Sequence, residues 1–350
     1  MKALDSESPV WFRLREVAEL VLGRGACWRS RPGRRWGGSG QFEGSQRGCA
    51  VPAFLPFVIV TAARDEAVLI ETTIQSVVAQ TAQPMRWVIV SDGSTDGTDA
   101  IVERYCAQHA WMELQRIDRR EGRNFAGKAK AFNAGLASLA ALPYEVAVCL
   151  DADVICVPGY FAYLLGKLSA DPSLGLIGTP SLDPAREMYD YRYTSIEEVS
   201  GTCQMFRRAC VEAIGGYVAS PGGNIDTIAC VMARMKGWKT QTFTQMILRH
   251  QRSMGTAERS PMQEQFNRRS RDYIVGNSAL WELFRTGYQM TRKTRLVRGR
   301  AALALDFLWA ALRRTQRPVS AEFIAFRCRE QMERLRRAML RRNSPRLEAC

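Results

Sequence analysis

In VCLDADVIC, residues Val148–Cys156, an apolar run is followed by two aspartates, Asp151 and Asp153, with one small residue between them. Side chains at positions i and i+2 of a strand point to the same side, so both carboxylates can face one cleft where a buried strand ends. Two converging carboxylates repel each other unless a cation lies beside them. Mg²⁺ or Mn²⁺, which prefer oxygen ligands, fit that arrangement, and an ordinary surface turn is the alternative interpretation.

Segments with strand and helix patterns alternate around this run. The predicted strands are residues 57–62, 86–91, 112–117, 145–150, 174–179 and 240–247, and the predicted helices are residues 66–80, 99–109, 128–142, 226–236 and 321–342. Such alternation with short polar loops predicts an α/β fold, a mostly parallel sheet flanked by helices on both faces. In these sheets, ligands bind outside the carboxyl ends of the strands.

The charge of the chain is unevenly distributed. The 350 residues are 46% hydrophobic and carry a net charge of +14, as expected for a globular, basic protein. Residues 251–350 carry 22 basic and 9 acidic side chains, whereas residues 51–250 carry 18 and 21. We expect a flexible basic leader (residues 1–53), an α/β domain (54–250) and a basic helical C-terminal region (251–350) that meets an anionic surface. Its apolar patch, residues 301–312, suits a helix lying in a membrane interface, or one packed on the domain.

Cysteine usage and hydropathy indicate the compartment. The ten cysteines form no CxxC pairs, which favours reduced thiols in a cytosolic protein over a disulfide framework or a zinc site. No apolar run is long enough to cross a bilayer, and no secretory signal is visible. The sequence therefore predicts a cytoplasmic protein, peripheral at the inner face of the cell membrane where its basic region meets anionic lipid.

Three further polar segments lie at predicted strand ends or open a helix. TAARDEA (Thr61–Ala67) combines small residues, which let a ligand approach the backbone, with charged ones. SDGSTDGT (Ser91–Thr98) places Asp92 where a carboxylate can accept N–H groups of a base. GKAKAFNAG (Gly127–Gly135) presents Lys128 and a helix N-terminus to a diphosphate or a base edge. Each segment taken alone is also compatible with a plain turn or a helix cap.

Taken in order, these segments resemble the inverting glycosyltransferases of family 2, whose nucleotide-sugar-binding domain has the GT-A fold. The resemblance covers roughly residues 56–250. Members of the family usually show a PxxNE-type loop, a DDGSxDxT loop, a GxxxAxNxG-type helix start, a DxD motif and a later ED pair. Here these read AARDEA, SDGSTDGT, GKAKAFNAG, DAD and Ile225–Asp226. Ser91 and Ile225 stand where the family usually has an acid, and Asp65 stands where it usually has Asn.

The resemblance implies a role for each matching residue. Asp226 would be the general base, and Asp153 would ligate Mg²⁺ or Mn²⁺ on the diphosphate. His250, which follows a predicted strand, either joins the metal or acceptor site or is a loop histidine. The implied nucleotide-sugar-binding residues are Ala62, Ala63, Arg64, Glu66, Asp92, Lys128, Asp151 and Ala152. Arg252, Arg268 and Asp272 would meet a phosphorylated acceptor, or are simply solvated side chains.

The expected function is metal-dependent transfer of a sugar, with inversion, from a nucleotide sugar to an acceptor hydroxyl. The donor is expected to be UDP-linked, although Asp92 could serve uridine or guanosine, and the acceptor to be a glycan or a lipid-linked glycan in cell-surface polysaccharide or glycolipid synthesis. A nucleotidyltransferase would instead carry a glycine-rich basic loop directly after the first strand. A nucleic-acid-binding protein is disfavoured because the aromatic and basic residues do not interleave in an RNA motif. A relative that binds nucleotide without turnover is the remaining alternative.

Overall fold

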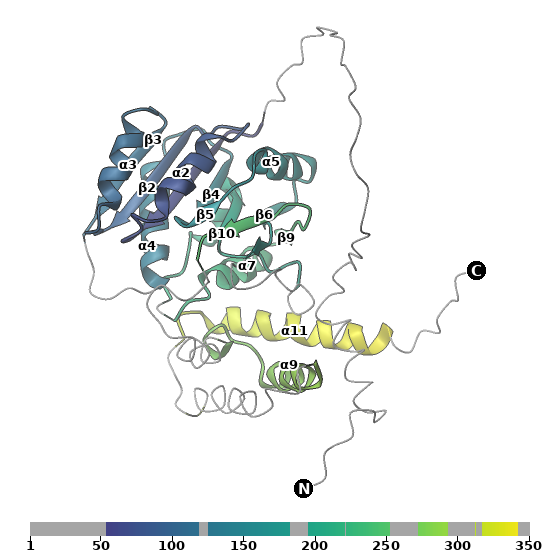
Figure 1. Ribbon diagram of the computed structural model, residues 1–350. Coiled ribbons are helices and arrows are strands. Elements are labelled where there is room, and N and C mark those ends of the chain that lie inside the picture. The colour runs from purple at the N-terminus through teal and green to yellow at the C-terminus, as the bar shows by residue number, and fades with distance from the viewer. Residues whose placement is uncertain are drawn as a thin grey trace, which may run out of the picture.

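The computed structural model describes residues 54–118, 125–182, 195–220, 222–252, 272–292, 312 and 317–341. They form an α/β domain followed by two helices, α9 (Ala279–Arg292) and α11 (Ala321–Arg341), as Figure 1 shows. The predicted leader, Arg268 and residues 301–311 of the apolar patch lie outside the described residues. Within the described part of the chain, no helix combines the length and the apolarity needed to cross a membrane.

A seven-stranded sheet with the order β3-β2-β1-β4-β8-β6-β9 forms the centre of the domain. Adjacent strands of this sheet pair in parallel, except that β8 runs antiparallel to β4 and β6. The predicted α/β architecture with a mostly parallel sheet is therefore confirmed. The strands are β1 (Phe57–Ala63), β2 (Arg86–Asp92), β3 (Met112–Ile117), β4 (Val146–Leu150), β6 (Leu174–Gly178), β8 (Cys203–Arg207) and β9 (Lys239–Thr242).

Two layers of helices cover the two faces of this sheet (Figure 1). Ile59 of β1 packs into the first layer and Val60 into the second, and both side chains are buried. Because successive strand residues point to opposite faces, a strand buried on both sides needs an uninterrupted apolar run such as FVIV. The first layer contains α2 (Ile70–Val78), α3 (Thr98–Cys106) and α5 (Tyr160–Ala170), and the second contains α4 (Phe125–Ser138), α6 (Arg208–Ile214) and α7 (Ile225–Met235).

A small second sheet, β5-β10-β7, brings the segment around residue 250 next to the end of β4. β5 (Val154–Ile155) runs antiparallel to β10 (Leu248–His250), which is parallel to β7 (Ser181–Leu182). The prediction of one strand over residues 240–247 is wrong, because β9 ends at Thr242 and the chain turns before β10 begins. The residues that follow β9 leave the large sheet and enter the small one, and a local sequence pattern does not mark that change.

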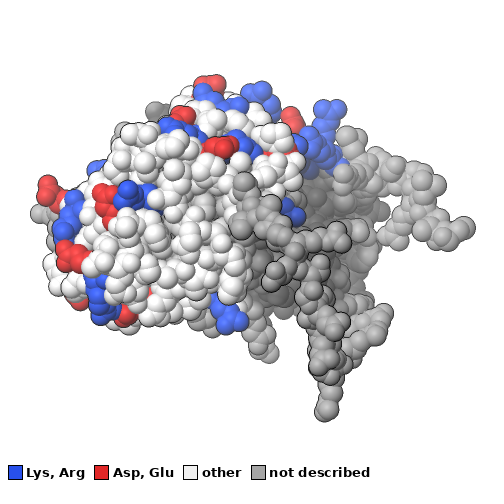
Figure 2. All heavy atoms as spheres, turned by 90° about the horizontal axis from the view of Figure 1, so that it is seen from above, with Lys and Arg blue, Asp and Glu red and all other residues white. Residues whose placement is uncertain are grey.

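The surface of the α/β domain carries charges of both signs. Figure 2, a view from above relative to Figure 1, shows basic and acidic side chains lying close to one another on that face. This arrangement agrees with the near balance of 18 basic and 21 acidic residues over residues 51–250. Asp92 and Asp153, which lie at the carboxyl ends of β2 and β4, are instead buried.

Candidate functional site

The two aspartates that follow β4 lie in a cluster of charged groups. Asp151 forms an ion pair with Lys128 of α4. Asp153 lies 2.7 Å from Nε of Arg252 and 3.5 Å from Nδ1 of His250, measured from its Oδ2. Each carboxylate therefore has its own basic partner, and the partners come from segments far away in the sequence.

Three side chains of this cluster could hold a divalent ion together. One ligand atom from each of Asp151, Asp153 and His250 lies within 4.8 Å of the other two. The pairing of His250 with Val154 across β10 and β5 places the imidazole beside Asp153, and Gln251 N–H donates to the Asp153 carbonyl at 2.9 Å. Two carboxylates and one imidazole are ligands that Mn²⁺ accepts, so this donor set fits a divalent ion.

Burial and neighbouring charges give the two carboxyl groups opposite pKa shifts. Burial raises the pKa of Asp151, and the charge of Lys128 offsets this only in part. Burial also favours neutral Asp153, but the adjacent His250 imidazole and the charge of Arg252 outweigh it and lower the pKa of Asp153. Burial lowers the pKa of His250, yet Asp153 raises it by more. Asp153 is therefore held ionised, as a metal ligand must be.

Asp226 lies in the first turn of α7 and is connected to the Asp151 side of the cluster through Gly201. Its Oδ2 accepts the Gly201 N–H at 3.1 Å, and Lys128 Nζ donates to the Gly201 carbonyl at 2.7 Å. The chain enters α7 through Asn224, whose φ of 58° is a left-handed conformation that Asn adopts more readily than most residues. A carboxylate in the first turn of a helix is stabilised by the helix dipole. Gly201 therefore bridges Asp226 and Lys128 through its two backbone hydrogen bonds.

The ends of β1 and β2 form the other side of the site. Arg64 Nη1 lies 3.5 Å from Oδ2 of Asp92. Glu66, in the same loop as Arg64, accepts a hydrogen bond from Arg252 Nη2 at 2.6 Å, so Arg252 joins this loop to Asp153. The three alanines predicted to contact the nucleotide sugar lie at or just after strand ends. Ala62 and Ala63 end β1, and Ala152 lies between the two aspartates, where its carbonyl accepts a hydrogen bond from Thr73 Oγ1 at 2.8 Å.

The helix after β1 begins later than predicted. The helix expected from residue 66 begins at Ile70, and the N–H groups of residues 65–67 bond instead to side chains that follow β2. Asp65 N–H donates to Ser94 Oγ at 3.1 Å, and Glu66 N–H donates to Thr98 Oγ1 at 2.8 Å. Asp65 has a φ of 51°, a left-handed conformation in which Asn and Asp are enriched. This backbone conformation explains why Asp can stand where the family usually has Asn.

The helix-start motif GKAKAFNAG contributes Lys128 to the cluster, and two of its other residues serve packing. Because α4 begins at Phe125, Lys128 lies one turn inside the helix and reaches Asp151 with its side chain. Asn133 exchanges two hydrogen bonds of 2.9 Å with the backbone of Tyr217. A Cβ at Gly135 would lie 2.6 Å from Val60 Cγ1, so only glycine lets α4 approach β1 this closely.

Thr202 contacts the site although the sequence pattern did not identify it. Its carbonyl accepts the Asp151 N–H at 3.0 Å, and its Oγ1 lies 3.2 Å from His250 Nε2. Thr202 directly precedes β8, and only the antiparallel pairing of β8 with β4 brings it to this position. Asp272, predicted to meet an acceptor, forms an ion pair with Arg285 of α9.

Comparisons with known proteins indicate the family of this domain. Residues 58–215 match the family model described as glycosyl transferase family 2. The chain is 30% identical over 119 residues, 34% of its length, to the poly-beta-1,6-N-acetyl-D-glucosamine synthase of Staphylococcus aureus (strain COL). It is 25% identical over 173 residues, 49% of its length, to the synthase of the same name from Staphylococcus epidermidis. The matches span only 27% and 37% of those two proteins.

A solved structure supports the same fold. The structure of a mannosyltransferase from Pyrobaculum calidifontis in complex with GDP-Man and Mn²⁺ matches with a TM-score of 0.53 at 18% identity, covering 83% of this chain and 87% of that one. The shared architecture is the large, mostly parallel sheet flanked by helices. The solved structure shows the fold alone, and the family model shows that residues 58–215 of this glycosyltransferase form a domain of glycosyltransferase family 2.

Proposed function

We propose that the protein transfers a sugar from a nucleotide sugar, a UDP-sugar, to an acceptor hydroxyl with inversion, and that it requires a divalent ion. The observation that carries this proposal is the Asp151–Asp153–His250 cluster within 4.8 Å, to which Asp226 is connected through Gly201 and Lys128. Metal ligands and a separate carboxylate in one site are what such a displacement requires.

Asp153 and His250 would hold Mg²⁺ or Mn²⁺, and Asp151 would be the third donor or contact the ribose. A divalent ion bound there would stabilise the charge that develops on the leaving nucleoside diphosphate. Lys128 and Arg252 add fixed positive charge at the same place, because they contact Asp151 and Asp153 respectively. Glu66 would orient Arg252 toward the diphosphate through their 2.6 Å hydrogen bond.

Asp226 would take the proton of the acceptor hydroxyl. A sugar hydroxyl is a poor nucleophile, so a carboxylate within hydrogen-bond reach must accept its proton as attack proceeds. Gly201 N–H fixes one oxygen of Asp226 at 3.1 Å, and Thr227 N–H fixes the other at 2.9 Å. Each oxygen still has a lone pair for an acceptor hydroxyl. A single base on the face opposite the leaving group leads to inversion at the anomeric carbon.

The nucleobase would lie at the ends of β1 and β2. Asp92 offers a carboxylate to the N–H groups of a base, and Arg64, 3.5 Å away, holds that carboxylate in place. Ala62, Ala63 and Ala152 would let the nucleotide approach the backbone because their side chains are small.

We further propose a glycan or lipid-linked acceptor for cell-surface polysaccharide or glycolipid. Support comes from the names of the staphylococcal relatives, which are synthases of an N-acetyl-D-glucosamine polymer. The 22 basic and 9 acidic residues of residues 251–350 support contact of that region with an anionic membrane surface. This region would place the catalytic domain at the inner face of the cell membrane.

A donor panel tests the activity. The protein is incubated with Mn²⁺ and UDP-N-acetylglucosamine, UDP-glucose, GDP-mannose or a dTDP-sugar, and release of nucleoside diphosphate is measured. We expect release from a UDP-sugar. Asp226→Asn should lower turnover by about 100-fold or more and retain UDP binding, since only proton transfer is lost. Asp153→Asn should instead lose Mn²⁺-dependent UDP binding.

Asp99→Asn is the matched control, because Asp99 pairs with Arg116 of β3 and has no role in the proposed mechanism. It should behave as the wild type in both assays. Nucleotide binding without release from any donor would identify a passive nucleotide binder and contradict the proposal. Full turnover by Asp226→Asn would show that another group is the base.

A further inference from the structure

Helix α11 packs against the helix that carries Asp226. Figure 1 shows α11 running alongside α7 and α9 at the base of the domain. Phe323 of α11 is buried in an apolar cluster with Ile228 and Val231 of α7. These contacts fix α11 on one face of α7. The contact nearest in sequence to Asp226 is Ile228, two positions after it.

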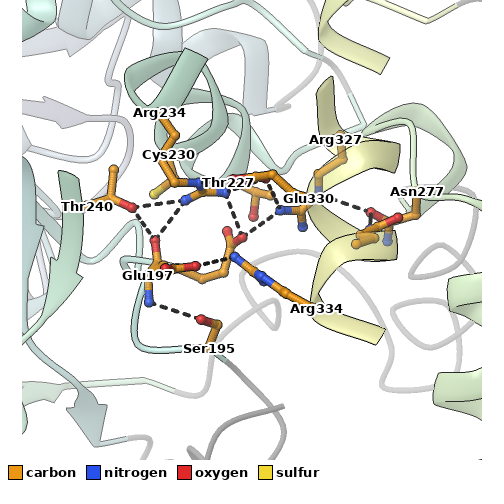
Figure 3. Close-up of polar contacts among 12 residues, drawn as sticks. Ser195, Glu197, Thr227, Cys230, Arg234, Thr240, Asn277, Arg327, Glu330 and Arg334 are labelled. Carbon is orange, nitrogen blue, oxygen red and sulfur yellow. Dashed lines mark hydrogen bonds and ion pairs between the residues drawn. The ribbon is translucent and has the colours of Figure 1, made fainter. Parts of the chain in front are cut away.

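Buried ion pairs add a second connection, which runs to the segment before β8 (Figure 3). Glu198 Oε1 lies 2.7 Å from Nη1 of Arg327 in α11 and 3.2 Å from Nη2 of Arg234 in α7. Arg234 Nε also lies 2.6 Å from Glu330 in α11. These four side chains are only 10–16% exposed. Removing one of these side chains would leave its partners with less compensation for their buried charges, so the pairs restrain all three segments.

The backbone between this network and the catalytic site is short and restrained. Glu198 and Gly201 are separated by two residues. The Glu198 carbonyl accepts a hydrogen bond from Thr242 Oγ1 at 2.9 Å, and Val199 N–H donates to Cys230 Sγ at 3.4 Å. Because the backbone of this segment is restrained, we expect a displacement of Glu198 to move Gly201 as well.

The other end of this segment contacts the site itself. Gly201 donates to Asp226 at 3.1 Å and accepts from Lys128 at 2.7 Å, and Thr202 lies 3.2 Å from His250. Residues 198–202 thus connect the ion pairs of α11 to the proposed base, the proposed diphosphate contact and one proposed metal ligand.

We infer that α11 is a positioning element of the catalytic site. Arg327 and Glu198 act as positioning residues that hold Asp226 and His250 in place through residues 198–202. The inference rests on the proposed role of Asp226 as the base. It assigns to the C-terminal helix an effect on turnover, in addition to any effect on stability.

The test uses the full chain with Arg327→Ala and Arg327→Lys. Arg337→Ala is the matched control, because Arg337 lies on the same helix, is 76% exposed and, among the described residues, pairs with Glu333 one turn away at 3.5 Å. For Arg327→Ala we expect kcat to fall about tenfold while KM for the donor changes less than about twofold. Arg327→Lys keeps the charge and should restore part of kcat. Arg337→Ala should match the wild type.

A second readout does not depend on activity. Hydrogen exchange of the amides of residues 199–204 should be faster in Arg327→Ala than in the wild type, and unchanged in Arg337→Ala. If Arg327→Ala does not fold, Glu198→Gln removes the same ion pair with little change of shape, and both readouts are applied to it.

Two outcomes would overturn the inference: unchanged kcat in a folded variant that lacks the ion pair, or unchanged exchange at residues 199–204. A lower melting temperature with wild-type kcat would mean that α11 only stabilises the fold. If the wild type turns over no donor, the proposed function fails instead, and the exchange measurement still decides whether α11 restrains this segment.

Discussion

Arg252 and Asp153 are in direct contact: Nε of the guanidinium lies 2.7 Å from Oδ2 of the carboxylate. The same oxygen lies 3.5 Å from Nδ1 of His250. Arg252 is oriented by Glu66, whose Oε1 lies 2.6 Å from Nη2. A divalent ion that binds Asp153 and His250 must therefore share the carboxylate with a fixed positive charge.

Arg252→Gln should strengthen binding of Mn²⁺ to the nucleotide-free protein. Arg252 competes for the Asp153 oxygen and repels the ion, so its loss should raise the affinity about tenfold, the equivalent of roughly 1.4 kcal/mol for a partly exposed charge. Titration calorimetry with Mn²⁺ measures the change. Arg249→Gln is the control, because Arg249 lies in β10, three residues before Arg252, with an exposed side chain. Unchanged or weaker Mn²⁺ binding in Arg252→Gln would show that Arg252 does not compete with the ion.

Gly201→Ala should lower turnover with little effect on donor binding. A Cβ there would lie 3.1 Å from both Cβ and Oδ2 of Asp226, so the carboxylate must shift by a few tenths of an ångström. Misplacing a general base by this amount should reduce kcat by about tenfold or more. Steady-state kinetics and UDP binding measure the two effects. Gly166→Ala, in open space on α5, is the control and should keep wild-type kcat. Equal losses of kcat and UDP affinity would contradict the proposed role of Asp226.

The sheet and its acidic residues could be predicted because their signals are local. The run FVIV of β1 and the run VAVCL of β4 are apolar at every position, as strands buried on both faces must be. Asp151 directly follows β4 and Asp92 is the last residue of β2, so the carboxyl-end rule for parallel sheets is enough to bring them to one edge.

The remaining contacts depend on pairings that no local pattern encodes. His250 reaches Asp153 because β10 pairs with β5, two strands of two or three residues each. Thr202 reaches Asp151 through the antiparallel neighbour of β4. Arg327 and Glu198 are 129 positions apart and meet only through the docking of α11. The motif GKAKAFNAG also serves two purposes: Lys128 contacts Asp151, whereas Gly135 allows α4 to pack closely on β1.

Gly135→Ala should destabilise the protein without affecting the chemistry of the site. The new Cβ would lie 2.6 Å from Val60 Cγ1 and 2.9 Å from Val90 Cγ2, both in the packed core. Overpacking of this kind typically costs roughly 1–3 kcal/mol of unfolding free energy. Gly166→Ala, also inside a helix but in open space, should instead stabilise by up to about 1 kcal/mol. Urea unfolding of the two variants measures both effects, and a stable Gly135→Ala would show that α4 can move away from β1.

Glu198→Gln should remove a pH-dependent part of the stability. Burial raises the pKa of Glu198, but the charges of Arg327 and Arg234 outweigh it and bring the pKa to about 2, compared with 4.5 for an ordinary glutamate. A carboxyl group whose folded-state pKa is depressed stabilises the protein above its unfolded-state pKa. This stabilisation is lost as the pH falls from about 4.5 toward 2.

The shift corresponds to at most roughly 3 kcal/mol of unfolding free energy. Urea unfolding of the wild type and of Glu198→Gln at pH 7, 5, 4 and 3 measures the difference between them. We expect the wild type to be more stable by the largest margin at pH 7, with little change down to pH 5 and a narrowing margin below that. At pH 3 the carboxyl of Glu198 is still largely ionised in the folded wild type, because its pKa is about 2, so part of the margin should persist there. A margin that is the same at all four pH values would show that the carboxyl of Glu198 is not held ionised by these two arginines.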